Sequence, residues 1–451
     1  MTYSVLRKKH TTFTYESYSY YIEGKDLVIR FIFSLSPSIA FKPVVVIKSI
    51  DPKRIQNLDQ DILDNFIFHL GLAEIPSYWK AAVSPKIHIK AGYLSSSQIR
   101  WWQELIENGL GEFFYVNKIP YTKNFVKIKT ANASKKLALR KLELKNRYLV
   151  PMGGGKDSFI TAELIKKSNN EFRTFVMGNV PAAENASRAV SSLSPIRVTR
   201  TIDPQLIALN KKGYLNGHTP FSSYLAFVSV LTAFLFDYRH IAISQEQSSN
   251  EGNIKVGKKV INHQYSKSFE FEKAFREYVS RYLSPDISFF SFLRPLHELQ
   301  IAALFSQYPQ YLSIFRSCNV NLKQNTWCGT CAKCFTIYLL LAPFLQEKTM
   351  RTIFKKNLLD DPDLWKYIPD FLGKTSHRSF DCIASAKETK MALDLIIKKY
   401  KDNNQSLPSL LGRCIKEFHP KKQNGQQFLR SWNQHHFLPK SLAIELHKAI
   451  S

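Results

Sequence analysis

Acidic residues are scarce in this 451-residue chain, where 36 Asp and Glu stand against 63 Lys and Arg and give a formal net charge of +27. The imbalance predicts a surface field that attracts anions such as RNA, acidic lipids or nucleotide-bearing substrates, without saying which. Cysteine is also scarce, with six residues. Because small secreted domains carry a denser and more even cysteine framework, we expect a chain that works in the reducing cytoplasm.

Long apolar runs are missing as well. The longest, around residues 225–236 and 335–345, hold about a dozen residues each, short of the roughly 20 that a bilayer-spanning helix needs. We expect both to be buried helices. The first residues are basic and then polar, without the apolar stretch and cleavage site of a signal peptide, so export is not expected.

The 44% apolar content is enough for a substantial core, and the patterning predicts three consecutive domains. Residues 1–145 begin with alternating, aromatic-rich segments and continue with helical spacing, which predicts a β-rich mixed domain. Gly109 follows one helical segment where a C-terminal cap would lie. Residues 146–346 alternate strand and helix patterns and predict a parallel α/β sheet domain. Residues 347–451 are expected to be helical.

The stretch from Lys118 to Arg147 is strongly basic, with ten Lys or Arg and one acid, Glu143. Such a run is most often a solvated linker or helix face, and RNA binding is the alternative.

A glycine-rich segment, Pro151-Met-Gly-Gly-Gly-Lys-Asp-Ser158, ends an apolar strand pattern and opens a helical one. Free backbone N–H groups and the helix dipole converge on anions at such a point, so the segment predicts a phosphate-binding loop. The candidate nucleotide-binding residues are Gly153, Gly154, Gly155, Lys156, Asp157 and Ser158. Glycines permit close approach, Lys156 supplies a cation and Ser158 a hydroxyl, while Asp157 would cap the helix or help to hold Mg²⁺.

This segment is not a Walker A loop, because Val150 stands where that pattern needs Gly and Asp157 stands where it needs Ser or Thr. It resembles the PP-loop of the ATP-pyrophosphatase (adenine nucleotide alpha hydrolase-like) superfamily, Ser-Gly-Gly-x-Asp-Ser, with Gly153 in place of the first Ser. The resemblance implies an enzyme that splits ATP to AMP and pyrophosphate to activate a second substrate.

Four of the six cysteines, Cys318, Cys328, Cys331 and Cys334, lie within 17 residues of sequence. Four thiolates at these spacings can enclose a tetrahedral Zn²⁺, and the absence of an open ligand position predicts a structural metal. Buried hydrophobic cysteines and a redox Cys-x-x-Cys are the alternatives. The order of Arg294-Pro-Leu, Cys318 and Cys-Gly-x-Cys-x-x-Cys is similar to that of 7-cyano-7-deazaguanine synthases.

Nearly the whole chain resembles the MurL family, the UDP-N-acetylmuramoyl-L-alanyl-L-glutamate epimerases of peptidoglycan synthesis. The resemblance rests on the glycine loop, the cysteine segment and four further segments: Asn108–Asn117, Asn216–Ser222, Ser248–Asn253 and Asn262–Lys267. A looser match follows at Phe371-Leu-Gly and Ser379–Ile383, where Arg378-Ser-Phe-Asp stands in place of a Lys-Pro-Phe-Glu type sequence.

The resemblance implies ATP- and Mg²⁺-dependent inversion of the terminal L-Glu of UDP-N-acetylmuramoyl-L-Ala-L-Glu to D-Glu through an acyl-adenylate. His218, His263 and Tyr265 lie in polar segments and are the candidates for proton transfer, although a lone His is more often structural. Glu246, Asn250, Glu251 and Asn262 are candidate substrate contacts, the first three because they follow an apolar strand.

A PP-loop enzyme that adenylates or thiolates tRNA or a nucleobase is the main alternative, which the basic charge supports, although no RNA-binding appendage is recognisable in the sequence. A non-enzymatic zinc-ribbon binding module is the third hypothesis.

Overall fold

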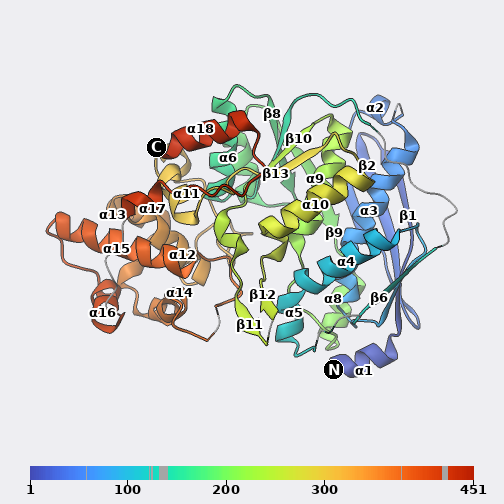
Figure 1. Ribbon diagram of the computed structural model, residues 1–451, viewed down its shortest axis with the longest axis horizontal. Coiled ribbons are helices and arrows are strands. Elements are labelled where there is room, and N and C mark those ends of the chain that lie inside the picture. The colour runs from blue at the N-terminus through green and yellow to red at the C-terminus, as the bar shows by residue number, and fades with distance from the viewer. Residues whose placement is uncertain are drawn as a thin grey trace. The chain divides into compact units, whose positions relative to one another are not determined.

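The computed structural model describes residues 1–56, 58–120, 122, 125–131, 141–257, 259–376, 378–418 and 425–451. The chain is α/β, with a large mixed sheet and many helices (Figure 1). It divides into two compact units, each built from separated segments. Unit 1 comprises Met1–Leu149, Ile196–Ile241 and Ile261–Phe289, and unit 2 comprises Val150–Pro195, Ala242–Val260 and Phe290–Ser451. The predicted division into three consecutive domains stays a prediction.

Unit 1 holds most of the strands. Its elements are α1 (Tyr3–Lys9), β1 (Thr12–Glu23), β2 (Asp26–Leu35), β3 (Ile39–Phe41), β4 (Val44–Ile47), α2 (Pro52–Gln56), α3 (Gln60–Trp79), β5 (Lys86–Ile89), α4 (Ser96–Gly109), α5 (Gly111–Val116), β6 (Lys127–Thr130), β9 (Ile196–Thr201), α8 (Pro204–Lys211), α9 (Phe221–Phe236), η2 (Tyr265–Lys267) and α10 (Phe269–Tyr282). Strands β7 (Tyr148–Pro151), β10 (His240–Ile243), β12 (Lys259–Ile261) and β13 (Ser288–Ser291) each contain a point where the chain passes between units.

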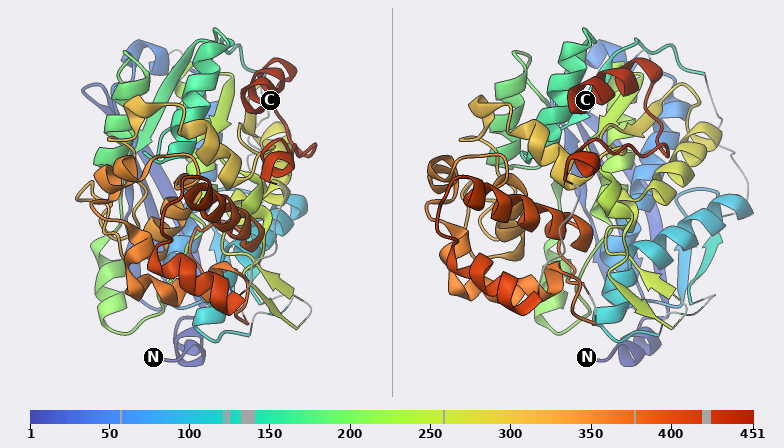
Figure 2. Two further views of the ribbon diagram at one scale, coloured as in Figure 1. Left: turned by 90° about the vertical axis from the view of Figure 1, so that its left-hand side faces the viewer. Right: turned by 60° about the vertical axis from the view of Figure 1, so that its left-hand side comes forward.

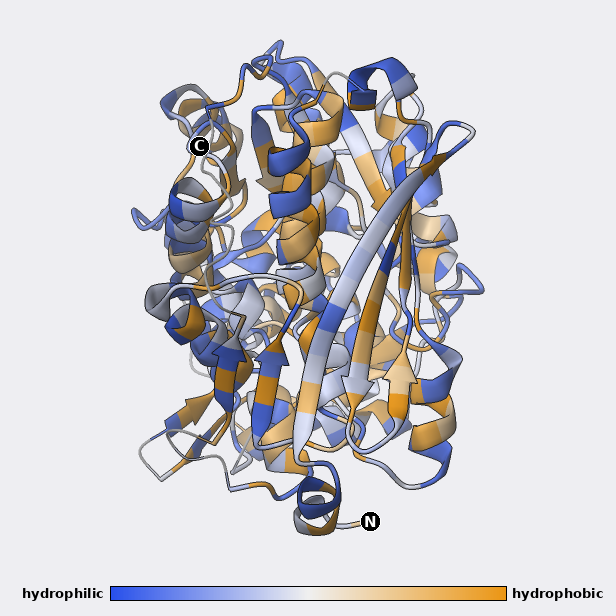
Figure 3. Ribbon diagram, turned by 90° about the vertical axis from the view of Figure 1, so that its right-hand side faces the viewer, coloured by the Kyte–Doolittle hydropathy of each residue, from blue (hydrophilic) through white to orange (hydrophobic). Residues whose placement is uncertain are grey.

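The sheet of unit 1 is mixed in direction. Its strands run in the order β9-β4-β2-β1-β5-β6, with β3 also paired to β2. The β1–β2 hairpin is antiparallel, whereas β5 pairs in parallel with both β1 and β6. Apolar and polar bands alternate along these strands (Figure 3), as expected of a sheet with one covered face. The predicted β-rich beginning is therefore confirmed, and β7 and β10 form a parallel pair.

Helix α3 packs on β1 and β2 of this sheet and against α9, whose Tyr224 lies under the guanidinium of Arg200 from β9. Both helices are buried almost all round, which explains why neither shows a strongly amphipathic pattern. Aromatic side chains of the sheet and of α3 form the core, as in the stacked pair of Tyr15 and Phe68, whose ring centroids lie 5.9 Å apart. The apolar run at residues 225–236 is thus a buried helix, as predicted, and no helix in the described ranges is long and apolar enough to cross a membrane.

The predicted glycine cap at Gly109 is wrong. Helix α4 is stabilised at its beginning by a capping box of Ser95 and Gln98, and Gly109 is its last residue, with Leu110 in the cap position. A Cβ on Gly109 would lie 2.9 Å from the Pro220 Cβ, closer than side chains normally come. The glycine therefore serves a close approach of two segments and not a left-handed turn.

Unit 2 holds the glycine loop, the cysteine segment and the C-terminal helices. Its elements are α6 (Lys156–Lys167), β8 (Phe172–Met177), α7 (Pro181–Val190), η1 (Gln247–Asn250), β11 (Ile254–Val256), α11 (Glu298–Phe305), η3 (Pro309–Tyr311), α12 (Ala332–Leu341), α13 (Glu347–Phe354), η4 (Leu358–Asp360), η5 (Pro362–Tyr367), α14 (Ile368–Phe371), α15 (Ala386–Asp402), α16 (Ser409–Phe418), α17 (Gly425–Leu429) and α18 (Lys440–Ile450).

Helix α11 is central to unit 2, because it contacts α6, α12, α15 and α18. The apolar α12 packs on α13 and α15, in the group of orange and red C-terminal helices in Figures 1 and 2. The C-terminal helix α18 returns to α6, the helix that follows the glycine loop. The predicted helical C-terminal region is confirmed in its secondary structure, and its contacts place it around the elements that carry the glycine loop.

Candidate functional site

The glycine loop connects β7 to the beginning of α6, as its sequence predicts. Gly154 has a φ of +85°, and a Cβ there would lie 2.6 Å from the backbone carbonyl carbon of Ala182, so only glycine fits. Gly155 is the N-cap of α6 and offers no side chain for capping. The first backbone N–H groups of α6 therefore have no side-chain cap at this end, which is the arrangement that suits an anion.

Lys156, the first residue of α6, is buried, with 2% of its surface exposed. Its Nζ contacts the carboxylate of Glu298 and lies 2.5 Å from Asp157 Oδ1. Burial alone would lower the pKa of Lys156, but the two carboxylates outweigh it and raise the pKa above its ordinary value. Lys156 is therefore a fixed cation at the beginning of the helix. The hydroxyl of Ser158 donates to the Gly155 carbonyl at 3.0 Å and so braces the loop.

Glu298 begins α11 and joins the glycine loop to the cysteine segment. One carboxylate oxygen contacts Lys156, and the other lies 3.8 Å from Nζ of Lys333, which stands between Cys331 and Cys334. Glu298 follows the Arg294-Pro-Leu segment by two residues, and the sequence alone assigned it no role. Its position beside the lysine of the glycine loop is a long-range contact, which spacing does not reveal.

The loop after β10 is held by a buried arginine. Arg294 has no exposed surface, and its guanidinium donates to the Glu246 carbonyl at 2.7 Å and to the Ser249 hydroxyl at 2.9 Å. It also donates to Ser291 Oγ at 3.1 Å. Glu246 itself is buried, with 7% exposed. The predicted substrate loop is thus a rigid 3₁₀ turn, fixed through its backbone by the Arg294 side chain.

Asn250 and Glu251 lie at the end of this turn. The Asn250 side-chain amide donates back to the Gln247 carbonyl, and the Glu251 carboxylate lies 3.3 Å from Arg378. Burial raises the pKa of Glu251, although Arg378 opposes the change. Arg378 belongs to the looser part of the MurL resemblance. Its pairing with Glu251 connects the C-terminal region to the predicted substrate loop.

Glu388 of α15 makes a second connection to that loop. Its carboxylate is fully buried and accepts a hydrogen bond from the Ser248 hydroxyl at 2.7 Å. It also accepts from the Ser385 backbone N–H at 2.8 Å, as part of the capping box that begins α15, and lies 3.8 Å from His297 Nδ1. The helical C-terminal region therefore supports the loop after β10 from within unit 2, a role that the sequence did not assign.

The structure brings the four predicted metal ligands together. The Sγ atoms of Cys318, Cys328, Cys331 and Cys334 all lie within 4.8 Å of one another, and those of Cys328 and Cys334 are 3.6 Å apart. Zinc–sulfur bonds of about 2.3 Å in a tetrahedron require sulfur atoms about 3.8 Å apart, so the spacing suits a metal site with four cysteine ligands. The contacts also fit a thiol cluster that could form a disulfide, so the assignment of zinc rests on the donor set.

A second constellation, in unit 1, is formed by residues from distant segments. The rings of His218 and His263 lie edge to face, with an interplanar angle of 76° and centroids 6.1 Å apart, and His218 Nδ1 lies 3.3 Å from Glu112 Oε2 of α5. Burial, with contributions from His263, Lys80 and Lys267, lowers the pKa of His218 to about 4. His218 is therefore uncharged at neutral pH. Its Nε2 is buried and has no hydrogen-bond partner within the described part of the chain.

Lys80, at the end of α3, holds the loop that carries His218. Its ammonium donates to the Gly217 carbonyl and, at 2.6 Å, to the Thr219 hydroxyl, on either side of the histidine. Burial and the positive charge of Arg200 lower the pKa of Lys80 to about 8. Nothing in the sequence around Lys80 marks it, because its partners are more than 130 residues away.

The other two predicted residues of this unit have local roles. Tyr265 packs edge-on against Phe271, and burial raises its pKa to about 12, with a hydrogen bond to Asn108 opposing the change. The Asn262 side chain accepts a hydrogen bond from the Gln264 backbone N–H at 2.8 Å. Tyr265 is thus protonated at neutral pH and would act in proton transfer only as an acid.

Part of the basic stretch from Lys118 to Arg147, including residues 132–140, lies outside the described residues. Arg147 has a structural role, because its guanidinium donates to the carbonyls of Phe236 and Asp237 at the end of α9 and stacks on Tyr238 at 4.4 Å. For this residue the contacts favour the structural interpretation of the basic stretch over RNA binding.

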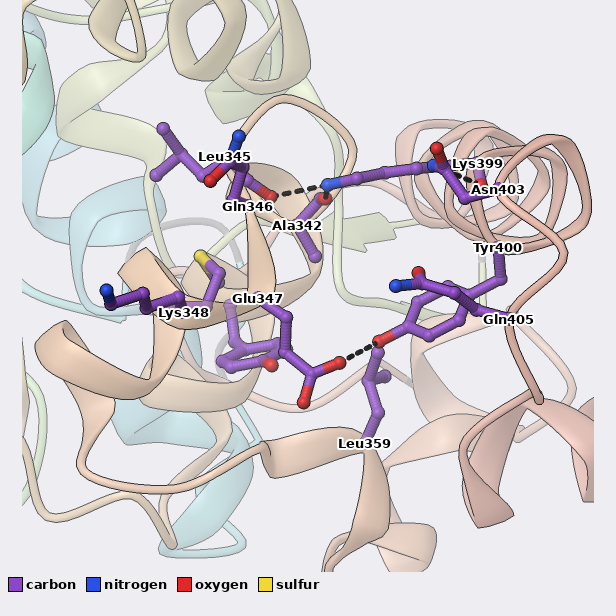
Figure 4. Close-up of a pocket in the computed structure, with 12 residues that line it drawn as sticks. Ala342, Leu345, Gln346, Glu347, Lys348, Leu359, Lys399, Tyr400, Asn403 and Gln405 are labelled. Atoms are coloured by element: carbon purple, nitrogen blue, oxygen red, sulfur yellow. Dashed lines mark hydrogen bonds between the residues drawn. The ribbon is translucent and has the colours of Figure 1, made fainter.

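A separate pocket of about 330 Å³ lies among α12, α13 and α15 (Figure 4). Its half-buried lysine, Lys399, donates to the carbonyls of Ala342 and Leu345, and Tyr400 donates to Glu347 Oε2 at 3.0 Å. Glu347 also pairs with Arg351 at 2.6 Å. These charged groups already satisfy one another, and none of the residues predicted from sequence lines the pocket, so we do not assign it to the functional site.

Comparison with known proteins gives the same family over both units. The MurL N-terminal domain matches residues 5–292, and the MurL C-terminal domain matches residues 314–426. Three relatives are named UDP-N-acetyl-alpha-D-muramoyl-L-alanyl-L-glutamate epimerase. The relative from Xanthomonas oryzae pv. oryzae (strain MAFF 311018) is 32% identical over 330 residues, 72% of each chain. That from Micromonospora sp. (strain ATCC 39149 / NRRL 15099 / SCC 1413) is 30% identical over 334 residues, again 72% of each chain.

The third relative, from Salinispora tropica (strain ATCC BAA-916 / DSM 44818 / JCM 13857 / NBRC 105044 / CNB-440), is 29% identical over 325 residues, which cover 71% of this chain and 70% of its own. The matched domains include the glycine loop, both histidines and the four cysteines. With a family domain over more than half of its length and relatives aligned along most of it, this chain belongs to the MurL family.

Proposed function

We propose that this protein is an epimerase that inverts the terminal L-Glu of UDP-N-acetylmuramoyl-L-Ala-L-Glu, and that it uses ATP to do so. Family membership, with relatives named for this epimerisation, supports the substrate and the reaction class. The observation that supports the use of ATP is the glycine loop at the beginning of α6, with Lys156 fixed as a buried cation beside it. AMP and pyrophosphate are the expected by-products.

Activation by ATP has a chemical reason. Loss of the Cα proton next to a carboxylate would place a second negative charge beside the first. In the proposed first step, an α-carboxylate oxygen of the substrate attacks the α-phosphorus of ATP and pyrophosphate leaves, which gives an acyl-adenylate. The carbanion formed next spreads onto the acyl carbonyl as an enolate, which oriented donors stabilise. Water then cleaves the inverted acyl-adenylate to the D-Glu product and AMP.

His218 and His263 are the proposed proton-transfer pair. His218 is uncharged at neutral pH because burial lowers its pKa to about 4, and the Glu112 carboxylate beside Nδ1 favours a proton on that nitrogen. The lone pair then lies on the buried Nε2, where a base is needed. The ring of His263 is the neighbouring candidate, nearly perpendicular to that of His218 with the centroids 6.1 Å apart, which supports it as the second member of the pair.

Two metal ions belong to this proposal. Asp157, which keeps part of its carboxylate exposed beside Lys156, would contact the Mg²⁺ that accompanies ATP, since carboxylate oxygen suits that ion. The four cysteines would hold a structural Zn²⁺. Mg²⁺ bound to ATP would neutralise part of the charge on the triphosphate, and the basic surface would attract the UDP pyrophosphate and carboxylates of the substrate.

The test is incubation of the purified protein with ATP, Mg²⁺ and the L-Glu substrate, with measurement of AMP release and of glutamate chirality after acid hydrolysis. The proposal expects substrate-dependent AMP together with D-Glu. A reaction in water enriched in deuterium would also place deuterium at Cα of the product. The D-Glu isomer of the substrate serves as a control, since proton exchange from that side should label it as well.

Two outcomes would contradict the proposal in different ways. AMP release without D-Glu or deuterium at Cα would keep carboxylate activation but replace the epimerisation by another reaction. D-Glu formation without ATP would keep the epimerisation and remove the acyl-adenylate. If neither AMP nor D-Glu forms in a folded sample that binds ATP, an RNA or nucleobase substrate becomes the next to test.

A further inference from the structure

The cysteine segment touches the backbone of the glycine loop. The backbone N–H of Arg316 donates a hydrogen bond of 2.8 Å to the Gly154 carbonyl. One residue later, the Ser317 Cβ lies 3.6 Å from the position that a Cβ on Gly155 would occupy, which is ordinary contact distance. Cys318, the first ligand of the cysteine cluster, follows directly. The chain that enters the cluster therefore packs along the loop proposed to bind phosphate.

A second connection runs through charged side chains. Lys333 stands between Cys331 and Cys334 at the beginning of α12, and its Nζ lies 3.8 Å from Oε1 of Glu298. Oε2 of Glu298 contacts the ammonium of Lys156. All three side chains are largely buried, with 12%, 7% and 2% exposed for Lys333, Glu298 and Lys156. A continuous chain of charges therefore links the cysteine cluster to the cation of the glycine loop.

Both connections begin within two residues of a cysteine in the cluster. Arg316 precedes Cys318 by two positions, and Lys333 has a cysteine on either side at one and two positions. The Arg316 guanidinium adds rigidity by donating to the Asn325 carbonyl at 3.0 Å, inside the segment between the first two cysteines. An ion that fixes the four sulfur atoms consequently also fixes Arg316 and Lys333, because groups so close in the chain share the restraint.

Lys333 also affects how Lys156 meets a phosphate. Glu298 shares its charge between two lysines, so its attraction for Lys156 is weaker than that of a carboxylate with one partner. If Lys333 were neutral, Glu298 would hold the Lys156 ammonium more strongly and the phosphate would compete less well for it. Lys333 donates in addition to the Cys382 carbonyl at 2.5 Å, which fixes the direction of its side chain.

From these contacts we infer that the four-cysteine centre orders the nucleotide loop, and that Lys333 and Glu298 are positioning residues for the phosphates of ATP. The inference rests on the proposed function in one respect, the binding of ATP by the glycine loop. The cysteine centre would then do more than stabilise its own segment. Removal of its metal should loosen the glycine loop and weaken ATP binding.

The experiment compares the metal-containing protein with protein treated with a zinc chelator. Three quantities are measured: zinc content, the Kd for ATP with Mg²⁺ by calorimetry, and hydrogen exchange of the amides in residues 153–158. Loss of zinc should raise the Kd for ATP at least about tenfold and speed exchange of these amides, as expected when a hydrogen bond to a charged group is lost. Addition of Zn²⁺ should reverse both effects.

Lys333→Met is the variant that keeps the inference testable if the metal-free protein unfolds. It should retain its zinc and raise the Kd for ATP by about tenfold. Lys323→Met is the matched control, because Lys323 is an exposed lysine between Cys318 and Cys328 and should leave the Kd unchanged. Lys333→Arg should keep most of the affinity, since it keeps the charge beside Glu298.

The inference is overturned if folded, metal-free protein binds ATP with an unchanged Kd, or if Lys333→Met and Lys323→Met bind ATP equally well. The native protein could instead bind no ATP while its glycine-loop amides exchange faster on loss of zinc. This result would support the effect of the cysteine centre on the loop and would refute the proposal that the loop binds ATP. The two failures are therefore distinguishable.

Discussion

Two buried lysines, one in each compact unit, have pKa values shifted in opposite directions. Lys156 of unit 2 meets two carboxylates, and its pKa is raised despite its burial. Lys80 of unit 1 meets a carbonyl and a hydroxyl, and burial together with Arg200 lowers its pKa to about 8. Burial is similar in the two cases, so the number of charged partners decides the result. Lys156 of unit 2 thus stays charged at neutral pH, whereas Lys80 of unit 1 can lose its proton near pH 8.

The two regions also differ in how the chain builds them. The glycine loop is a contiguous segment whose main-chain amides would bind phosphate, and its charges are balanced by Glu298 and Asp157. The His218 region draws its groups from the end of α3, from α5 and from two loops, and burial, helped by positive neighbours, keeps His218 uncharged. This difference agrees with the proposed function, in which unit 2 binds the phosphates of the nucleotide and unit 1 carries the residues for proton transfer.

Replacement of Lys156 should have the largest effect. Lys156→Met would leave the buried Glu298 carboxylate with only the more distant Lys333 and would remove the cation beside the partly exposed Asp157, which costs about 3–5 kcal/mol of stability. ATP-dependent AMP release should fall below detection. Urea unfolding and AMP release measure the two effects. Lys166→Met, on the exposed face of the same helix, is the control and should change neither. A Lys156→Met protein with ordinary AMP release would remove this lysine from nucleotide binding.

Replacement of His218 should separate the two units functionally. His218→Gln keeps a polar side chain but cannot accept the Cα proton, so formation of D-Glu should fall by about 10²–10⁴-fold. Substrate-dependent AMP release should persist, because the proposed adenylation would use the loop of unit 2 and not His218. His447→Gln, at an exposed histidine of α18, provides the control. Equal losses of AMP and D-Glu in His218→Gln would mean that the histidine acts in adenylation or in folding instead.

Features of the fold and of the candidate site could be predicted from the sequence where the residues involved are close together in the chain. Periodicity predicted the strands and helices around the glycine loop, because their patterns are local, and the cysteine cluster was predicted because its ligands are close in the chain. Lys80 and Glu112 were missed, since a long-range contact leaves no spacing to recognise. Gly109 was misinterpreted because a glycine required for close packing looks the same as one required for a turn. The MurL resemblance supplied the proposed substrate, which no local pattern contains.

Replacement of Lys80 should have a smaller effect than either change above. Lys80→Met removes two hydrogen bonds that flank His218, and we expect D-Glu formation to fall by about tenfold with AMP release unchanged. The native rate should also decline as the pH rises through about 8, where Lys80 loses its proton, and the variant should lack this decline. Lys86→Met, at an exposed position on β5, is the control. An identical alkaline decline in native protein and variant would assign it to another group.

The smallest expected effect concerns stability in mild acid. His69, His218 and His240, all in unit 1, have pKa values lowered to about 4, with burial as the main cause in each. Between pH 6.5 and about 4 the unfolded chain therefore binds more protons at these positions than the folded chain does, so the free energy of unfolding should fall as the pH decreases through this range.

In the described part of unit 2, His297 is the histidine whose pKa is lowered, so acid should weaken unit 1 first. Hydrogen exchange resolved by residue, at about pH 7.5 and about pH 5.5 with intrinsic rates corrected, would measure the difference. His218→Asn should reduce the pH dependence of the free energy of unfolding, because it removes one proton-binding site from the unfolded chain. Equal loss of protection from hydrogen exchange in both units would mean that they unfold as one cooperative structure. The opposite pKa shifts of Lys156 and Lys80 would then reflect local electrostatics only, and not a difference in stability between the units.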